Sequence, residues 1–274
     1  IRPRYLKPVP GLVLGLTDPV CGLNMGQTAE VLAKEFGITR KEQDEFALLS
    51  HKRAVAARLK LQEEIAAVYV PPKFDLVVEA DNGPRENQTM EALSKLRPFF
   101  DKYTGTVTVG NSCQVTDGAC ALLIMKEEKA RQLGYRPLGY IRAYTYTGVE
   151  PRKMGLGPAY AIPIVLKKAG LTLKDIDLIE INEAFAVQIL ACLKLLASKK
   201  FAEENFSAAS AIGEIDMDKF NVNGGAIALG HPVGVTGSRL ILTLLKEMKR
   251  RNSKFSLASL CVGGGQGGAI ILER

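Results

Sequence analysis

The stretch Asn221-Val222-Asn223-Gly224-Gly225-Ala226-Ile227-Ala228-Leu229-Gly230-His231-Pro232 places a histidine in a glycine-rich loop. A cysteine opens the next glycine-rich stretch, Cys261-Val262-Gly263-Gly264-Gly265-Gln266-Gly267. An imidazole and a thiol, each beside glycines that let a substrate reach the backbone, are groups used in acyl transfer. The two stretches therefore predict a reactive site that contains His231 and Cys261.

Strands and helices alternate around these stretches. From residue 135 onward we expect strands at 140–146, 176–181, 220–223, 255–262 and 269–273, with helices at 159–168, 184–197 and 235–250. Such alternation predicts an α/β domain with a mostly parallel sheet and right-handed crossovers. Asn182, His231 and Cys261 would then emerge at one sheet edge, outside the carboxyl ends of the strands, where open α/β sheets bind ligands.

The first part of the chain has a different pattern, with many charges and few apolar repeats. The capping box Thr39-Arg40-Lys41-Glu42 opens a helix, and a shorter helix is expected at 28–36. After Gly105 we expect a strand at 106–109 and a small-residue-rich, largely buried segment at 117–126. His51 lies among basic residues and is expected at the surface.

Composition limits the classes of protein. The chain has 274 residues, 47% of them hydrophobic, and no run approaches the roughly 18 apolar residues of a membrane span. The first residues have neither signal-peptide nor transit-peptide character, and the start at Ile1 instead of Met leads us to expect further residues upstream. Five cysteines without a Cys-x-x-Cys pair and two histidines predict no metal site and a reducing compartment. The net charge of +7 suits either nucleic acid or a polyanionic small molecule such as a nucleotide-bearing cofactor.

Each candidate residue has a simpler interpretation that the sequence leaves open. His231 taken alone would be a hydrogen-bonded core histidine, Cys261 a small buried residue, and Asn182 a helix cap. The run Gly263-x-Gly265-x-x-Gly268 has the letters of a dinucleotide motif, but a strand follows it instead of the required helix. We therefore expect a tight turn with a backbone N–H group aimed at a substrate oxygen.

Taken together, the motifs resemble those of the thiolases. The three C-terminal ones are Asn182-Glu183-Ala184-Phe185-Ala186, Gly230-His231-Pro232 and the Cys261 stretch. Ketosynthases, which share the fold, normally carry a second histidine where Cys261 stands. The likeness covers essentially the whole chain and includes Met25-Gly26-Gln27-Thr28-Ala29-Glu30, Leu96-Arg97-Pro98-Phe99-Phe100, Gly105-Thr106-Val107-Thr108 and Met154-Gly155-Leu156-Gly157-Pro158.

The resemblance implies a layered αβαβα fold with a mixed, mostly parallel sheet. Residues 1–104 would form a loop lobe that binds coenzyme A and takes part in oligomerisation. Residues 105–134 would end the N-terminal half-domain and, alone, expose apolar surface. Residues 135–274 would form the C-terminal half-domain.

The resemblance also implies a ping-pong transfer of acyl groups with coenzyme A and acyl-CoA as substrates and no permanently bound cofactor. Cys261 would move a proton on or off the acetyl α-carbon, and His231 would activate a nucleophilic cysteine. Asn182, through a water, and His231 would stabilise an enolate oxygen. The N–H of Gly263 would hold the tetrahedral oxyanion.

Met154, Phe185 and Phe100 would line the pantetheine and acyl channel, together with Met25 and Cys113. The basic lobe would receive the coenzyme A phosphates. Leu23-Asn24 lacks the histidine of short-chain enzymes, which favours a longer-chain 3-ketoacyl substrate, and Ser112-Cys113-Gln114 replaces the usual Ala-Ser-Gly. A homodimer or homotetramer is implied, in a bacterial cytoplasm or an organelle matrix.

The cysteine that acts as nucleophile in thiolases has no counterpart in this chain, because Cys21 belongs to the lobe. The chain alone is therefore expected to lack turnover. The alternative is a noncatalytic coenzyme A-binding partner subunit. A third hypothesis is nucleic-acid binding through the basic helix at 235–250.

Overall fold

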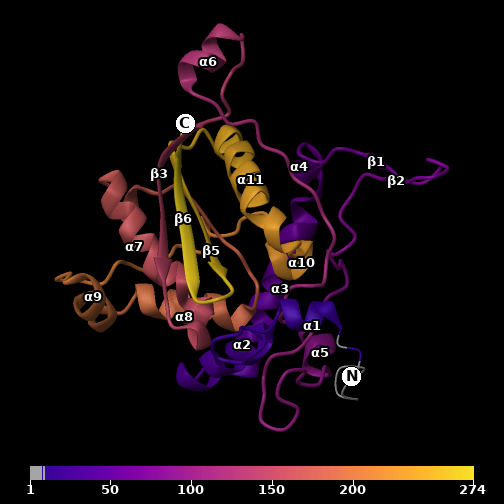
Figure 1. The fold of residues 1–274 in the computed structure, drawn as a ribbon, viewed down its shortest axis with the longest axis vertical. Helices are drawn as coiled ribbons and strands as arrows, with labels where there is room; N and C mark the ends of the chain where they lie inside the picture. The colour runs from indigo at the N-terminus through magenta and orange to yellow at the C-terminus, as the bar shows by residue number, and fades with distance from the viewer. Residues whose placement is uncertain (1–7, 9) are drawn as a thin grey trace, which may run out of the picture.

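A four-stranded sheet lies at the centre of the computed structural model, which describes residue 8 and residues 10–274 (Figure 1). Its strand order is β3-β6-β5-β4. The strands are β3 (Tyr140–Gly148), β4 (Leu178–Ile181), β5 (Phe255–Val262) and β6 (Gln266–Glu273). The helices of this half are α6 (Glu127–Gln132), η2 (Pro151–Leu156), α7 (Gly157–Ala169), η3 (Leu173–Asp175), α8 (Ala186–Leu196), α9 (Lys199–Phe206), α10 (Ala226–Leu229), η4 (Val233–Val235) and α11 (Thr236–Arg251).

The sheet is mixed, as predicted, but the prediction that it is mostly parallel is wrong. β4 runs parallel to β5, whereas β6 runs antiparallel to both β5 and β3. The cause is the turn at Gly264 and Gly265, whose φ angles of 85° and 81° favour glycine. This turn reverses the chain at once, so the last two strands form a hairpin instead of being joined by a crossover.

The sheet separates two apolar layers. In β4, Ile179 and Ile181 pack in a cluster with α7, whereas Leu178 packs in a cluster with α11. This alternation follows from the two-residue period of a strand. Figure 1 shows α7 and α11 on opposite sides of the strands. The predicted helices at 159–168, 184–197 and 235–250 correspond to α7, α8 and α11.

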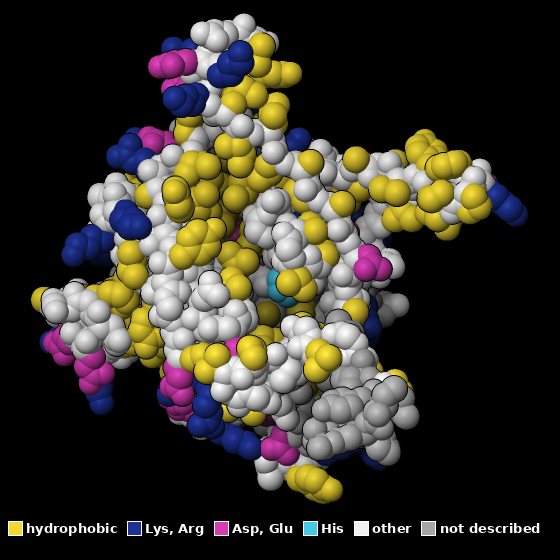
Figure 2. Space-filling view, viewed as in Figure 1, with side chains coloured by type: hydrophobic (Ala, Val, Ile, Leu, Met, Phe, Trp, Pro, Cys, Tyr) yellow, Lys and Arg dark blue, Asp and Glu magenta, His cyan; other side chains and the backbone are white. Residues whose placement is uncertain are grey.

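The described part of residues 1–104, the N-terminal lobe, is helical and irregular, as predicted. Residues 1–7 and 9 of the predicted lobe lie outside the described residues. The Thr39 capping box is confirmed, because Glu42 N donates to Thr39 Oγ1 and Thr39 N donates to Glu42 Oε2. The lobe contains α1 (Gly11–Gly15), α2 (Met25–Glu35), α3 (Arg40–Ala56), α4 (Arg58–Gln62), β1 (Val68–Tyr69), β2 (Val77–Val78) and α5 (Met90–Ser94). The β1–β2 arm projects from the body with hydrophobic side chains exposed (Figures 1 and 2).

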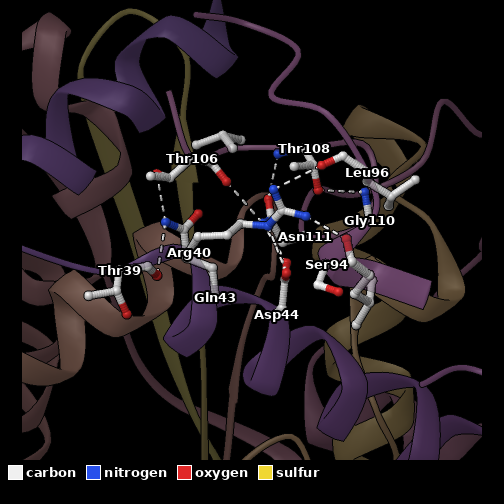
Figure 3. A network of polar contacts seen from close by, with 12 residues as sticks. Thr39, Arg40, Gln43, Asp44, Ser94, Leu96, Thr106, Thr108, Gly110 and Asn111 are labelled. Atoms are coloured by element: carbon white, nitrogen blue, oxygen red, sulfur yellow. Dashed lines mark hydrogen bonds and ion pairs between the residues drawn. The ribbon is translucent and has the colours of Figure 1, made fainter. Parts of the chain in front are cut away.

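A polar network fastens the segment after α5 to helix α3 (Figure 3). Asp44 accepts from Arg40 Nε at 2.7 Å and from Asn111 Nδ2 at 2.9 Å. Arg40 also donates to the backbone oxygen of Leu96 at 3.0 Å. Asn111 O then accepts from Ala186 N at 2.9 Å, so this network places the segment against the start of α8.

Three sequence-based assignments in irregular regions are wrong. Residues 106–109 form no strand; with no neighbouring strand to pair with, the N–H groups of Thr106 and Val107 donate to the Glu30 carboxylate instead. Segment 117–126 is mostly exposed, not buried. Within 220–223, only Phe220 forms a bridge, parallel to Ile179.

Apolar side chains lie open along the segment around residues 109–124. Val115, Leu123 and Ile124 are 85%, 74% and 69% exposed, as expected if this part of the chain stands alone. None of the helices within the described residues has the length and apolar character needed to cross a membrane.

Phe220→Ala should destabilise the fold strongly. Phe220 is fully buried in the main cluster and contacts the Phe46 ring, so its truncation leaves a cavity. We expect a loss of about 3–5 kcal/mol in the free energy of unfolding, measured by urea titration. Leu59→Ala, at a side chain that is 79% exposed, is the control and should change it by less than about 0.5 kcal/mol.

Candidate active site

Asn182 and His231 face each other at the carboxyl end of β4. Asn182 N donates to Ser259 O at 2.9 Å, which fixes this residue beside β5. Its side-chain Nδ2 lies 3.4 Å from His231 Nε2. The Asn182 side chain is buried, and its Oδ1 has no hydrogen-bond partner among the described residues. One buried acceptor therefore remains available next to the imidazole.

Backbone and side-chain contacts hold the His231 ring in one orientation. Its Nδ1 lies 2.6 Å from Thr236 Oγ1 at the start of α11, and its backbone N donates to Thr116 Oγ1. The Asn182 amide nitrogen is a donor, so we assign Nε2 as the acceptor and Nδ1 as the protonated nitrogen. Burial, and secondarily the charge of Arg239, lower the pKa of His231 to about 4. The imidazole is therefore neutral near pH 7, with Nε2 unprotonated.

Cys261 lies near the end of β5 in an apolar cluster. It is 7% exposed, and its pKa is raised to about 12 by burial, with a smaller contribution from nearby Cys113. The same cluster contains Met154 and Phe185, both buried, with Met25 and Phe100 packed against it. The thiol is consequently held protonated in unliganded protein.

The remaining predicted site residues adjoin this cluster. A Cβ placed on Gly263 would lie 3.4 Å from Met25 Sδ, so the β5–β6 turn is next to that side chain. Phe100 makes an edge contact with the Phe185 ring, with centroids 5.9 Å apart. Cys113 N donates to Ala184 O at 2.9 Å, and burial raises the pKa of its thiol to about 12.

The structure thus brings the predicted residues to one end of the sheet. Asn182 and His231 form one pair, while Cys261, Met154, Phe185, Met25 and Phe100 share the apolar cluster, with Gly263 and Cys113 at its border. The prediction that His51 lies at the surface is wrong, because its side chain is buried. Its Nδ1 accepts from Arg85 N, and burial lowers its pKa to about 4.

Two glycines of the loop before His231 allow close packing inside the protein. A Cβ on Gly225 would lie 2.2 Å from the Glu183 carboxyl carbon, and one on Gly224 would lie 2.7 Å from Ala54. These glycines let the loop approach Glu183 and α3. Glu183 itself was missed, although a carboxylate directly after a buried strand is a signal that the sequence offers.

The glycines at 263, 265 and 268 belong to a hairpin, not to a nucleotide-binding loop. Gly263 and Gly265 lie in the turn between β5 and β6, and Gly268 lies within β6, so a strand follows the turn, as predicted. Within residues 8 and 10–274, no three His, Cys, Asp or Glu side chains are grouped so as to hold a metal ion.

Family models match two parts of the chain. Residues 135–274 match the C-terminal domain of thiolase, and residues 9–128 match its N-terminal domain. The chain belongs to the thiolase family. It is 48% identical to the 3-ketoacyl-CoA thiolases of Shewanella halifaxensis and Photobacterium profundum, over 98% of this chain and 62% of each relative. The chain therefore spans about 62% of the length of these relatives.

Solved structures agree with this assignment. The acetyl-CoA acetyltransferase of Bacillus anthracis matches with a TM-score of 0.87 at 40% identity, over 98% of this chain and 66% of that one. A human mitochondrial 3-ketoacyl-CoA thiolase in complex with CoA matches with a TM-score of 0.82 at 40% identity, over 96% and 62%. The predicted thiolase-like α/β fold is thereby confirmed.

Acidification should weaken the fold through its two histidines. His51 and His231 have a pKa of about 4 when folded and 6.5 ordinarily, so the unfolded chain takes up protons first as the pH falls. The free energy of unfolding should fall between pH 6.5 and 4, by about 3 kcal/mol per histidine at most. Urea titrations from about pH 7 to pH 5 measure this slope. A slope unchanged in His51→Gln and in His231→Gln contradicts the prediction.

Cys261 should resist alkylation. Its thiol is buried and protonated, so iodoacetamide at about pH 8 should modify it far more slowly than the partly exposed Cys21. Peptide mass spectrometry over time, with urea-unfolded protein as the control, measures both rates. Equal rates in the folded protein would show that Cys261 is accessible.

Proposed function

We propose that this protein is an acyltransferase that cleaves 3-ketoacyl-CoA with coenzyme A, or runs the reverse Claisen condensation of an acyl-CoA with acetyl-CoA. The observation that supports it most is the buried thiol of Cys261 at the same sheet edge as the Asn182–His231 pair. The matched proteins are named 3-ketoacyl-CoA thiolase and acetyl-CoA acetyltransferase, and one is described in complex with CoA.

In the cleavage direction, His231 Nε2 takes the proton of a nucleophilic cysteine thiol. The thiolate attacks the 3-keto carbon, and the bond between C2 and C3 breaks. Its electron pair forms the enolate of acetyl-CoA, whose oxygen accepts from protonated His231 and, through a water, from Asn182. The Cys261 thiol then delivers its proton to C2, and acetyl-CoA leaves.

The second half-reaction restores the site. The thiol of coenzyme A gives its proton to the Cys261 thiolate and attacks the acyl-cysteine thioester. The N–H of Gly263 stabilises the tetrahedral oxyanion, a contribution of about 3–4 kcal/mol in comparable sites. The second product, an acyl-CoA two carbons shorter than the substrate, leaves, and His231 returns its proton to the nucleophilic thiolate.

The nucleophile of this scheme is not one of the five cysteines of the chain. Cys113, Cys192 and Cys261 have pKa values raised to about 12 by burial. The Cys192 thiol donates to Gly155 O, and no cysteine thiol of the described residues is hydrogen-bonded to His231. The chain alone is therefore proposed to lack turnover.

Substrate binding is proposed to involve the apolar cluster and the N-terminal lobe. Met154, Phe185 and Phe100, with Met25 and Cys113, would contact the pantetheine and a longer acyl chain, and the lobe would receive the coenzyme A phosphates. We propose a homodimer or homotetramer without a permanent cofactor. The five free cysteines fit a reducing compartment, the bacterial cytoplasm or an organelle matrix.

Thiolysis assays test the proposed activity. The natural gene product that carries this sequence should cleave acetoacetyl-CoA or, faster, longer 3-ketoacyl-CoA, whereas the 274-residue chain should not. Intact-mass measurement establishes which form is assayed. Turnover by the 274-residue chain refutes the claim about the nucleophile. Coenzyme A binding without turnover by any form would favour the noncatalytic partner subunit instead.

His231→Ala and Cys261→Ala should each lower kcat by orders of magnitude in the active form, because each removes a proton-transfer group. Cys21→Ser, at a thiol without a proposed role, is the matched control and should retain kcat. A near-normal rate in either alanine variant refutes the role of that residue.

A further inference from the structure

Glu183 is a buried carboxylate with no assigned role. It follows Asn182 directly, is 1% exposed, and forms no salt bridge with any cation of the described residues. An ionised group is costly to bury without a charged partner, unless hydrogen bonds compensate. The hydrogen-bond donors around the Glu183 carboxylate therefore indicate which parts of the chain it joins.

Three donors from separate parts of the chain converge on this carboxylate. Asn221 Nδ2 donates to Oε1 at 2.8 Å, and Ser50 Oγ, from α3, donates to Oε2 at 2.6 Å. Ile227 N, in the first turn of α10, donates to Oε2 at 3.3 Å. Ser50 Oγ also accepts from Gly225 N at 3.2 Å. The carboxylate thus joins α3, the loop after Phe220 and the start of α10.

The same contacts lead directly to His231. Ile227 belongs to α10, whose last hydrogen bond, from Gly230 N to Ala226 O at 2.8 Å, ends one residue before the histidine. On the other side, Glu183 is the neighbour of Asn182, which β5 fixes through Ser259. One carboxylate therefore connects the two residues of the pair through a few backbone bonds on each side.

We propose that Glu183 is a positioning residue that sets the separation of Asn182 Nδ2 and His231 Nε2. The role presupposes the proposed function, because this separation matters for catalysis only if both groups act on one substrate oxygen. Small displacements of such groups are enough to slow a reaction, since positioning by an enzyme contributes through sub-ångström geometry.

The site requires a carboxylate rather than any group of that shape. Asn221 cannot turn its amide to suit another partner, because its Oδ1 accepts from Ile181 N and its Nδ2 also donates to Ile181 O. In Glu183→Gln, the new NH₂ group would face either Asn221 Nδ2 or the donors Ser50 and Ile227. Each arrangement leaves a buried donor unpaired, so the loop must shift.

Glu30→Gln is the matched control. Glu30 is also buried, and its carboxylate also accepts backbone N–H groups, from Thr106 and Val107. Those contacts fasten the lobe and do not include the Asn182–His231 pair. A general effect of losing a buried acceptor would appear equally in both variants.

NMR of the histidine rings tests the positioning in the 274-residue chain without any need for turnover. The chain has two histidines, and His231→Gln identifies the His231 signals. Glu183→Gln should shift or broaden these signals, whereas Glu30→Gln should leave them as in the unsubstituted protein. Unchanged His231 signals in folded Glu183→Gln, or equal changes in both variants, overturn the proposal. If Glu183→Gln does not fold, Ser50→Ala is the variant that tests the proposal. We then expect a smaller change of the His231 signals, and unchanged signals in Ser50→Ala overturn the proposal.

Kinetics of the active form provide the second measurement. Glu183→Gln should lower kcat by about 10- to 100-fold, with KM within about threefold, because binding groups are untouched and only orientation changes. A normal kcat in folded protein overturns the proposal. Absence of turnover in every form would refute the proposed function, and the NMR comparison would then decide the role of Glu183 alone.

Discussion

The loop that leads from Asn221 to His231 depends on one buried carboxylate, Glu183, which has three hydrogen-bond donors but no salt-bridge partner among the described residues. Burial raises its pKa, while the hydrogen bonds from Ser50, Asn221 and Ile227 favour the charged form. Three parts of the chain must therefore stay in place together, since moving any one leaves a polar group without a partner in the core. Gly225 is required for the same reason, because any side chain there would occupy the position of the carboxyl group.

Desolvation is the main cause of the shifted pKa values of Cys261 and His231. It pushes the pKa of Cys261 up and that of His231 down, so that both groups are neutral in the unliganded protein. Such a site does not carry a charge before substrate arrives, and under the proposed function charge would develop on the thioester oxygen instead. The packing of Met154 and Phe185 is thus part of the acid–base behaviour of the thiol, not only of its stability.

Regular elements with strong local signals were predictable, and contact-dependent ones were not. Helix α7 was recognisable from its apolar pattern and from Gly170, whose φ of 69° ends it. The strand assigned to 106–109 was wrong, because strands exist only with partners and Glu30 took the N–H groups instead. His51 lies between Ser50 and Lys52, yet it is buried, which depends on how α3 packs and not on its neighbours in sequence.

The sequence by itself determined the family and the alternation of helices and strands, and it led to the proposal of Asn182, His231 and Cys261 as site residues, because these are local patterns and residue types. The tertiary structure decided the direction of β6, the shifts in the pKa values of Cys261 and His231, and the hydrogen-bond partners of Glu183. Those properties arise from contacts between residues far apart in the chain, such as Ser50 with Glu183, and from burial that no single segment specifies.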